Sequence, residues 1–127
     1  MTEKLGLSAD EVLTTTRAVR KRLDLTRPVP RDVLVECIDI AHQSPTGSNS
    51  QRWRWMIIED AAKKQVIADI YRTNFAAAYA GAPEPPPGSQ ADRVNQSARY
   101  LAEHLHEVPV LVIPLLADRM DEGTPSW

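Results

Sequence analysis

Apolar residues in the first third of the chain recur with the spacing of two helices. Ser8 and Glu11 have the spacing of a capping box, in which each side chain binds the backbone N–H of the other residue, so a helix is predicted to begin there. The β-branched run at residues 14–16 ends it. A second amphipathic helix is predicted over residues 30–42, and it stops at Ser44-Pro45 because a residue before proline avoids the helical region.

The rest of the chain alternates between extended and helical patterns. A short aromatic and β-branched run predicts a strand over residues 53–58, and helical spacing predicts a helix over 61–75. Four prolines and two glycines predict an exposed loop over 81–90. Another helix is predicted over 91–106, and a strand covered on both faces over 108–116 because that run is almost wholly apolar. The predicted buried stripe of the last helix is Val94, Ala98, Leu101, Ala102 and Leu105.

The order helix, helix, strand, helix, helix, strand predicts an α+β fold with both strands in one sheet flanked by helices. A length of 127 residues suits a single domain. A net charge of -2 argues against general attraction to nucleic acid or an anionic membrane. The lone cysteine and the absence of a signal-peptide or membrane-spanning run favour a cytoplasmic, soluble protein.

Residues 17–31 form a local cationic segment in this mildly acidic chain. The segment contains one acid, Asp24, and six basic residues: Arg17, Arg20, Lys21, Arg22, Arg27 and Arg31. Arginine's forked donors suit a phosphate group, so one interpretation is a phosphate-binding segment. The alternative is a solvated helix face without a ligand.

The stretch SPTGSNSQ at residues 44–51 is rich in hydrogen-bonding groups. Its hydroxyls, its amide side chains and the backbone near Gly47 could line the edge of a planar heterocycle. The alternative is a simple connection, because the same residues favour turns. Trp53 and Trp55 follow directly, and strand alternation places them on one sheet face with Arg54 on the other.

The remaining reactive side chains predict no catalytic group and no metal site. His104 and His106 diverge on a helix and lack the acidic or histidine partners of a metal shell. Cys37 falls on the apolar stripe of its helix, so a buried, unreactive thiol is expected. Neither a hydrolytic triad nor a glycine-rich phosphate loop is present.

Together, TTRAVRKRLDLTRPVP, the helix after it, SPTGSNSQRWRWMIIED and a further helix resemble the N-terminal half of the FMN-dependent nitroreductase family. The order and spacing match over about residues 8–72, and the run beginning at Val108 is similar to a later strand of the family. The resemblance implies a nitroreductase-like fold, and residues 1–127 are expected to form one partial domain whose C-terminal part is missing.

The resemblance also implies a set of site residues. Arg17, Ala18 and Arg20 lie where the family holds the FMN phosphate and ribityl chain. Pro45, Thr46, Gly47 and Asn49 lie where it contacts the flavin ring, usually from the partner subunit of a homodimer. NADH or NADPH is the implied electron donor, and a nitroaromatic, a quinone or a similar small molecule is the implied acceptor in a ping-pong reaction.

This sequence departs from the family pattern at several positions. Ala18 replaces the serine of the phosphate segment, and Arg52 replaces the proline before the tryptophan. The chain also ends before the family's remaining strands. An alternative function is therefore a flavin-free, catalytically inactive dimerisation or regulatory fragment. Nucleic-acid binding is disfavoured because the aromatic residues are not interleaved with the basic ones.

Overall fold

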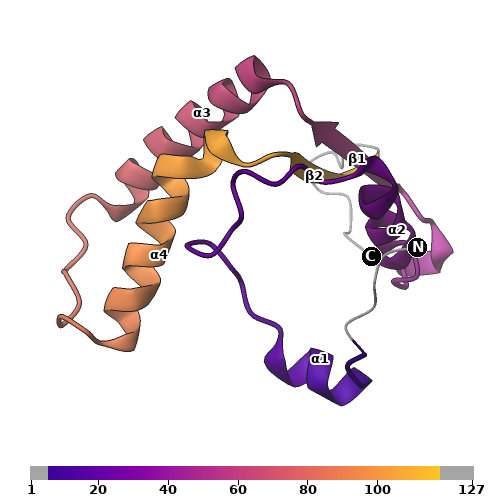
Figure 1. Cartoon of the computed structure of the whole chain (residues 1–127), viewed down its shortest axis with the longest axis horizontal. Helices are drawn as coiled ribbons and strands as arrows, with labels where there is room; N and C mark the ends of the chain where they lie inside the picture. Colours follow the sequence, from indigo (N-terminus) through magenta and orange to yellow (C-terminus); the bar gives the residue numbers. More distant parts are fainter. Residues whose placement is uncertain (1–5, 118–127) are drawn as a thin grey trace.

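The computed structural model describes residues 6–117, and its element order is the one predicted. The elements are α1 (Ala9–Thr15), α2 (Arg31–Ala41), η1 (Gly47–Asn49), β1 (Trp53–Ile58), α3 (Ala61–Tyr79), α4 (Gln90–His104), η2 (Leu105–Glu107) and β2 (Leu111–Leu116). In Figure 1, α3 and α4 lie side by side, the two strands lead away from them toward α2, and α1 stands apart. The described residues therefore form an open α+β arrangement of helices and one sheet.

The starts of the helices follow from local hydrogen bonds. The capping box at α1 is confirmed: Ser8 Oγ accepts from the Glu11 N–H at 3.3 Å, and Glu11 Oε2 accepts from the Ser8 N–H at 2.7 Å. Pro30 precedes α2 as its cap residue, one position before the first helical residue. Asp60 caps α3 by accepting from the Lys63 N–H at 2.9 Å. These short-range contacts explain why the predicted starts lie within one residue of the observed ones.

β1 and β2 form an antiparallel pair that runs from Trp53 opposite Leu116 to Ile58 opposite Leu111. The bounds of β1 are those predicted. Trp53, Trp55 and Ile57 are half-buried, whereas Arg54 and Met56 between them are exposed. This pattern confirms that both tryptophans share one face of the sheet.

The prediction for the second strand was wrong in two respects. It begins at Leu111 rather than Val108, because β1 ends at Ile58, opposite Leu111, and the Val108 carbonyl instead accepts from Lys64 Nζ of α3 at 2.6 Å. It is also not covered on both faces: Val112 and Leu115, which alternation places on opposite faces, are 39% and 41% exposed, and Leu116 is 68% exposed.

α3 and α4 form a helical hairpin around small buried residues. Ala68 is fully buried and Ala102 is 3% exposed. α3 runs four residues past its predicted end, to Tyr79, and Phe75 stacks on that tyrosine with ring centroids 4.4 Å apart. The proline-rich connection after α3 is almost wholly exposed, as predicted, and Ser89 ends it by capping α4.

Several apolar side chains predicted to be buried face solvent instead. Cys37 is exposed on α2, and Val94 of the predicted α4 stripe is 52% exposed. Two apolar residues of α3 that were given no predicted burial, Val66 and Ile70, are also more than half exposed. Periodicity located these helices correctly, but nothing in the described part of the chain covers these positions.

Candidate functional site

The loop between α2 and β1 is tightly folded by its own polar groups. Thr46 is its centre: its carbonyl accepts from the Asn49 N–H at 2.9 Å and its hydroxyl accepts from the Gln51 N–H at 3.0 Å. The Gln51 amide donates to Asn49 Oδ1 at 3.1 Å. Asn49 is exposed, and within residues 6–117 its amide nitrogen donates no hydrogen bond, so this donor is available.

The same loop contains three non-glycine residues in the left-handed region: Ser48, Asn49 and Gln51 have φ values of 52°, 51° and 45°. Such conformations cost free energy and persist only where surrounding contacts impose them. Gly47 is not among the residues with positive φ. The left-handed backbone of this loop therefore lies in the residues after Gly47.

A hydrogen bond between Trp55 and His42 closes the base of this loop. Trp55 Nε1 donates to His42 Nε2 at 2.7 Å, and the two rings lie 6.0 Å apart. His42 follows the last residue of α2, so the contact ties the end of the helix to the middle of β1. The sequence did not identify His42 and Gln51 as the residues that fix this loop. Their hydrogen-bond partners come close only when the chain folds back on itself.

The cationic segment between α1 and α2 is not helical. Asp24 organises its second half by accepting from the N–H groups of Thr26 and Arg27, each at 3.1 Å. These backbone donors, together with the Thr26 hydroxyl, lower the pKa of Asp24 below its ordinary value. Arg27 also pairs with Asp24 at 3.6 Å, so it is partly neutralised.

The predicted phosphate residues lie in the first half of that segment. Arg17 is exposed and its guanidinium donates to the adjacent Thr16 carbonyl at 2.7 Å; Ala18 is exposed and Arg20 is half-buried. In Figure 1 this part of the chain follows α1, whereas the α2–β1 loop lies at the far end of the strands. The structure therefore does not bring the two predicted groups together within one chain.

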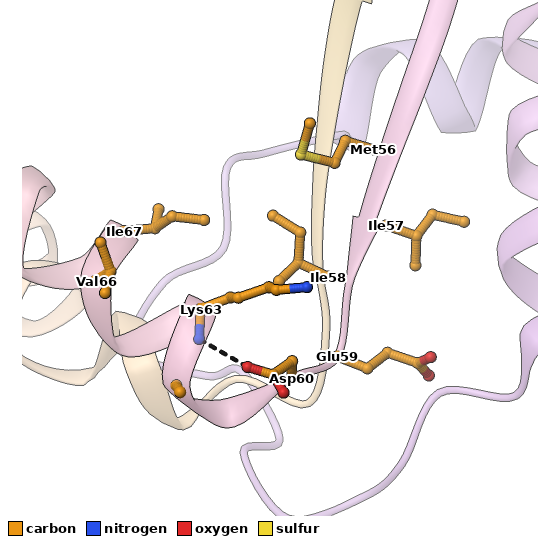
Figure 2. Close-up of a pocket in the computed structure, with 9 residues that line it drawn as sticks. Met56, Ile57, Ile58, Glu59, Asp60, Lys63, Val66 and Ile67 are labelled. Carbon is orange, nitrogen blue, oxygen red and sulfur yellow. Dashed lines mark hydrogen bonds between the residues drawn. The ribbon is translucent and has the colours of Figure 1, made fainter.

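Two concave surfaces of the described residues lie elsewhere. An apolar hollow of about 690 Å³ lies between β1 and the first half of α3, and its lining includes Met56, Ile58, Val66 and Ile67 (Figure 2). A second hollow runs along the exposed side of α2, from Arg31 to Gln43. Neither contains any of the predicted flavin residues.

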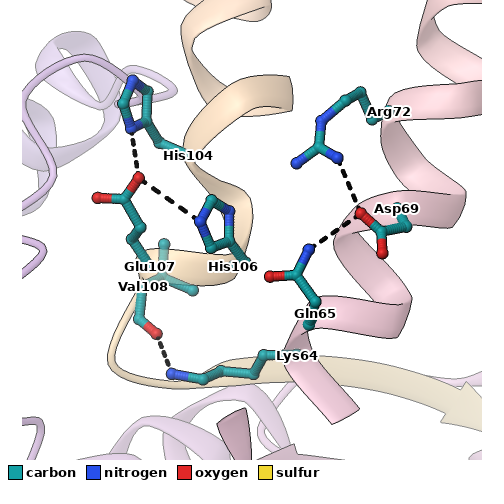
Figure 3. Close-up of polar contacts among 8 residues, drawn as sticks. All are labelled: Lys64, Gln65, Asp69, Arg72, His104, His106, Glu107 and Val108. Carbon is teal, nitrogen blue, oxygen red and sulfur yellow. Dashed lines mark hydrogen bonds and ion pairs between the residues drawn. The ribbon is translucent and has the colours of Figure 1, made fainter. Parts of the chain in front are cut away.

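Figure 3 shows polar contacts within the helical hairpin and one, from Lys64 to Val108, that ties α3 to the segment before β2. Lys64 Nζ donates to the Val108 carbonyl, and Glu107 accepts from His104 with Nδ1 and Oε1 2.7 Å apart. Asp69 holds Arg72 at 2.8 Å. No group of three or more metal-binding side chains is found in residues 6–117, and no helix there is long and apolar enough to cross a membrane.

Comparisons with known proteins match most of the chain. It is 29% identical over 96 residues to a 5,6-dimethylbenzimidazole synthase from Rhodospirillum rubrum, covering 76% of this chain and 42% of the relative. It is 30% identical over 98 residues to a chloronitrobenzene nitroreductase from Comamonas testosteroni, and this match covers 77% of this chain and 37% of the relative. The chain thus spans about two fifths of the length of these relatives.

A solved structure of oxidized iodotyrosine deiodinase, bound to FMN and 3-iodo-L-tyrosine, shares the fold. Its TM-score is 0.61 at 22% identity, and the match covers 80% of this chain and 53% of the deiodinase chain. The profile of the Nitroreductase family matches residues 13–126. This match includes both predicted flavin-binding segments, β1, the helical hairpin and β2. The chain belongs to the nitroreductase family.

Proposed function

We propose that the chain is part of an FMN-dependent NAD(P)H oxidoreductase of the nitroreductase type, acting in the cytoplasm. The observation that carries the proposal is the α2–β1 loop, which presents hydrogen-bonding groups from a base fixed by the Trp55–His42 bond. Membership of the family supports it, as do an FMN-bound structure of the same fold and a relative named for nitroreduction.

The chemistry of the two segments fits the two ends of FMN. The guanidinium groups of Arg17 and Arg20 would hold the phosphate, with Ala18 between them close to the ribityl chain. Pro45, Thr46, Gly47 and Asn49 would contact the flavin ring, and the free amide nitrogen of Asn49 is a donor suited to a ring carbonyl or nitrogen.

Because these segments lie apart in one chain, we propose that two copies build each site. One copy would supply the arginines and its partner would supply the α2–β1 loop. A homodimer would therefore contain two equivalent flavin sites. The exposure of Pro45, Gly47 and Asn49 in the single chain supports this arrangement, because a loop completing another subunit's site must face outward.

FMN would supply hydride transfer, accepting from NADH or NADPH and giving to a nitroaromatic, a quinone or a similar acceptor. The residues of this chain would hold and orient the ring, and the loop's donors would stabilise negative charge on it. No side chain is assigned as a catalytic acid or base. The organisation of residues 1–127 as one partial domain is part of the same proposal.

FMN titration of the purified chain, followed by visible absorbance and flavin fluorescence, tests this function. Replacing Arg17 and Arg20 together with alanine should weaken FMN binding by about 2–4 kcal/mol, at one to two per charge-assisted contact. The matched control is Arg72→Ala, which removes an exposed arginine paired with Asp69 on α3. Equal FMN affinity in the double variant and the control would refute the phosphate assignment.

A flavin-free dimerisation or regulatory fragment is the second candidate. The exposed apolar residues on α2, α3 and β2 favour it, because they offer a binding surface that needs no cofactor. This function predicts a stable assembly that neither takes up FMN nor oxidises NAD(P)H. Sedimentation together with the FMN titration separates the two candidates.

A further inference from the structure

The hydrogen bond between Trp55 and His42 requires a particular protonation state of the histidine. An indole N–H can only donate, so at 2.7 Å His42 Nε2 has to accept, and the ring then carries its proton on Nδ1. In an imidazolium both ring nitrogens carry protons, and neither can accept. His42 is exposed, so protons from the solvent can reach it. The bond therefore exists only while His42 is neutral.

The end of α2 stabilises the other, protonated form of this side chain. His42 is the C-cap residue of α2, and a cation is favoured beside the carbonyl groups at the C-terminal end of a helix. Asp39 stands three residues earlier on the same helix, a spacing at which side chains are neighbours. The neutral form thus gains the Trp55 N–H, whereas the protonated form gains the helix end and a carboxylate. Histidine side chains change between these two forms between about pH 5 and pH 8.

The segments next to His42 contribute few other charges. Arg54 of β1 lies on the opposite face of the strand from the bonded indole. The loop over residues 44–51 contains no charged residue, and neither does β2, which places Pro114 opposite that indole. Arg52, between the loop and β1, is the remaining charged residue of this part of the chain. The indole and α2 itself are therefore the main groups that favour one form of His42 over the other.

The same bond holds the α2–β1 loop against the strand that follows it. The hydrogen bonds that link Thr46, Asn49 and Gln51 join loop residues to one another, so they shape the loop. The bond from Trp55 to His42 instead spans 13 residues and joins the helix end that enters the loop to the middle of β1. Without it the loop would keep its own contacts but lose this attachment to β1, and its backbone would open more often.

We propose that His42 is a positioning residue for the α2–β1 loop and that it acts only in its neutral form. At about pH 8 it accepts from Trp55 and holds the loop, and at about pH 5 the imidazolium releases the indole. The loop is thus fixed in mildly alkaline solution and loosened by acid. The attachment itself requires no flavin, whereas its effect on FMN binding rests on the proposed function.

Nuclear magnetic resonance of the indole N–H groups tests the bond. His42→Gln is the matched variant, because the glutamine amide oxygen can accept in place of Nε2 and does not titrate. The signal of Trp55 is identified by its loss in Trp55→Phe. At about pH 8 its N–H should exchange with water equally fast in the parent and in His42→Gln. At about pH 5 it should exchange about fivefold faster in the parent, the factor that corresponds to one lost hydrogen bond. Trp53, whose buried Nε1 has no hydrogen-bond partner within residues 6–117, serves as the internal reference.

Hydrogen exchange of the backbone amides of residues 44–51 reports the state of the loop. After correction for the intrinsic effect of pH, protection should fall with acid in the parent and stay constant in His42→Gln. In Trp55→Phe, which lacks the donor, protection should be low at both pH values. His104 and His106 are present in all three proteins, so their protonation cannot produce a difference between them.

Equal pH responses of the parent and His42→Gln would overturn the proposal. A Trp55 bond that breaks in acid while the loop keeps its protection would overturn it as well. If His42→Gln does not fold, Trp55→Phe decides the question: loop protection equal to that of the parent at about pH 8 would refute the positioning role.

FMN titration at the same two pH values separates this proposal from the proposed function. The affinity should fall with acid more in the parent than in His42→Gln, and protonation of the FMN phosphate is common to both proteins. Equal losses of affinity would refute a role of His42 in the flavin site. If neither protein binds FMN at either pH, the proposed function fails, while the indole and amide measurements still decide the role of His42.

Discussion

Replacing Lys64 with methionine tests the contact that ties α3 to the residue before β2. Lys64 is only 8% exposed and its ammonium donates to the Val108 carbonyl at 2.6 Å, while Val108 itself is 7% exposed. Methionine keeps most of the apolar stem but removes the donor, so the carbonyl loses its charged partner. A second carbonyl, that of Pro109, lies 3.5 Å from the same nitrogen.

The magnitude follows from two opposing effects. Hydrogen bonds to charged groups contribute about 1.5–3 kcal/mol, and a buried carbonyl left without a partner costs about 1–3 kcal/mol. Relief from burying the ammonium offsets part of this cost. The free energy of unfolding should therefore fall by about 2 kcal/mol. The assay is urea unfolding followed by tryptophan fluorescence, in which the midpoint should fall while the slope stays constant.

The neighbouring Lys63→Met variant is the matched control. Lys63 is exposed on the first turn of α3, and the hydrogen bond that Asp60 makes there uses its backbone N–H, which the substitution leaves in place. Its effect should stay within about 0.5 kcal/mol. If the two variants unfold at the same urea concentration, the Lys64–Val108 contact does not hold the hairpin to the strand and the reasoning fails.

Two further predictions concern the helix starts. Ser89→Ala removes the hydroxyl that accepts from the Asp92 N–H at 3.1 Å and should lower stability by about 1 kcal/mol in the same urea assay; no change would show that the cap contributes nothing. Hydrogen bonds from Ser8 lower the pKa of Glu11, so the capping contribution is complete above the ordinary pKa of 4.5 and is lost as pH falls through the lowered value. Helicity measured by circular dichroism should therefore fall less with acid in Glu11→Gln, which keeps a capping side chain without a titrating group, than in the parent chain. An identical acid response in both proteins would contradict this assignment.

Local signals in the sequence predicted the positions of the elements well. Ser8 and Glu11 specify the start of α1 through contacts three residues apart, and Pro45 ends the helical pattern through its own sterics. The strand over Trp53–Ile58 follows from side-chain type alone. Each of these features depends on near neighbours in the chain, which a sequence displays directly.

The errors concern burial, because whether a side chain is buried depends on which other element packs against it. Cys37 and Val94 occupy apolar stripes but face solvent, because the described chain places no element against them. The start of β2 was missed because a lysine 44 residues earlier holds the Val108 carbonyl. The same limit applies to the site: the loop at Pro45–Asn49 was recognisable as a unit, but its fixation by His42 was not.

The position of Pro114 has a consequence for how far any assembly of this chain can grow. Edge strands with complete rows of N–H and C=O groups invite open-ended stacking, which leads to aggregation and fibres. The outer edge of β2 lacks a donor at its centre, because Pro114 has no N–H. A single proline thus makes the β2 edge a poor template for a further strand, and it protects the protein from open-ended stacking along that side of the sheet.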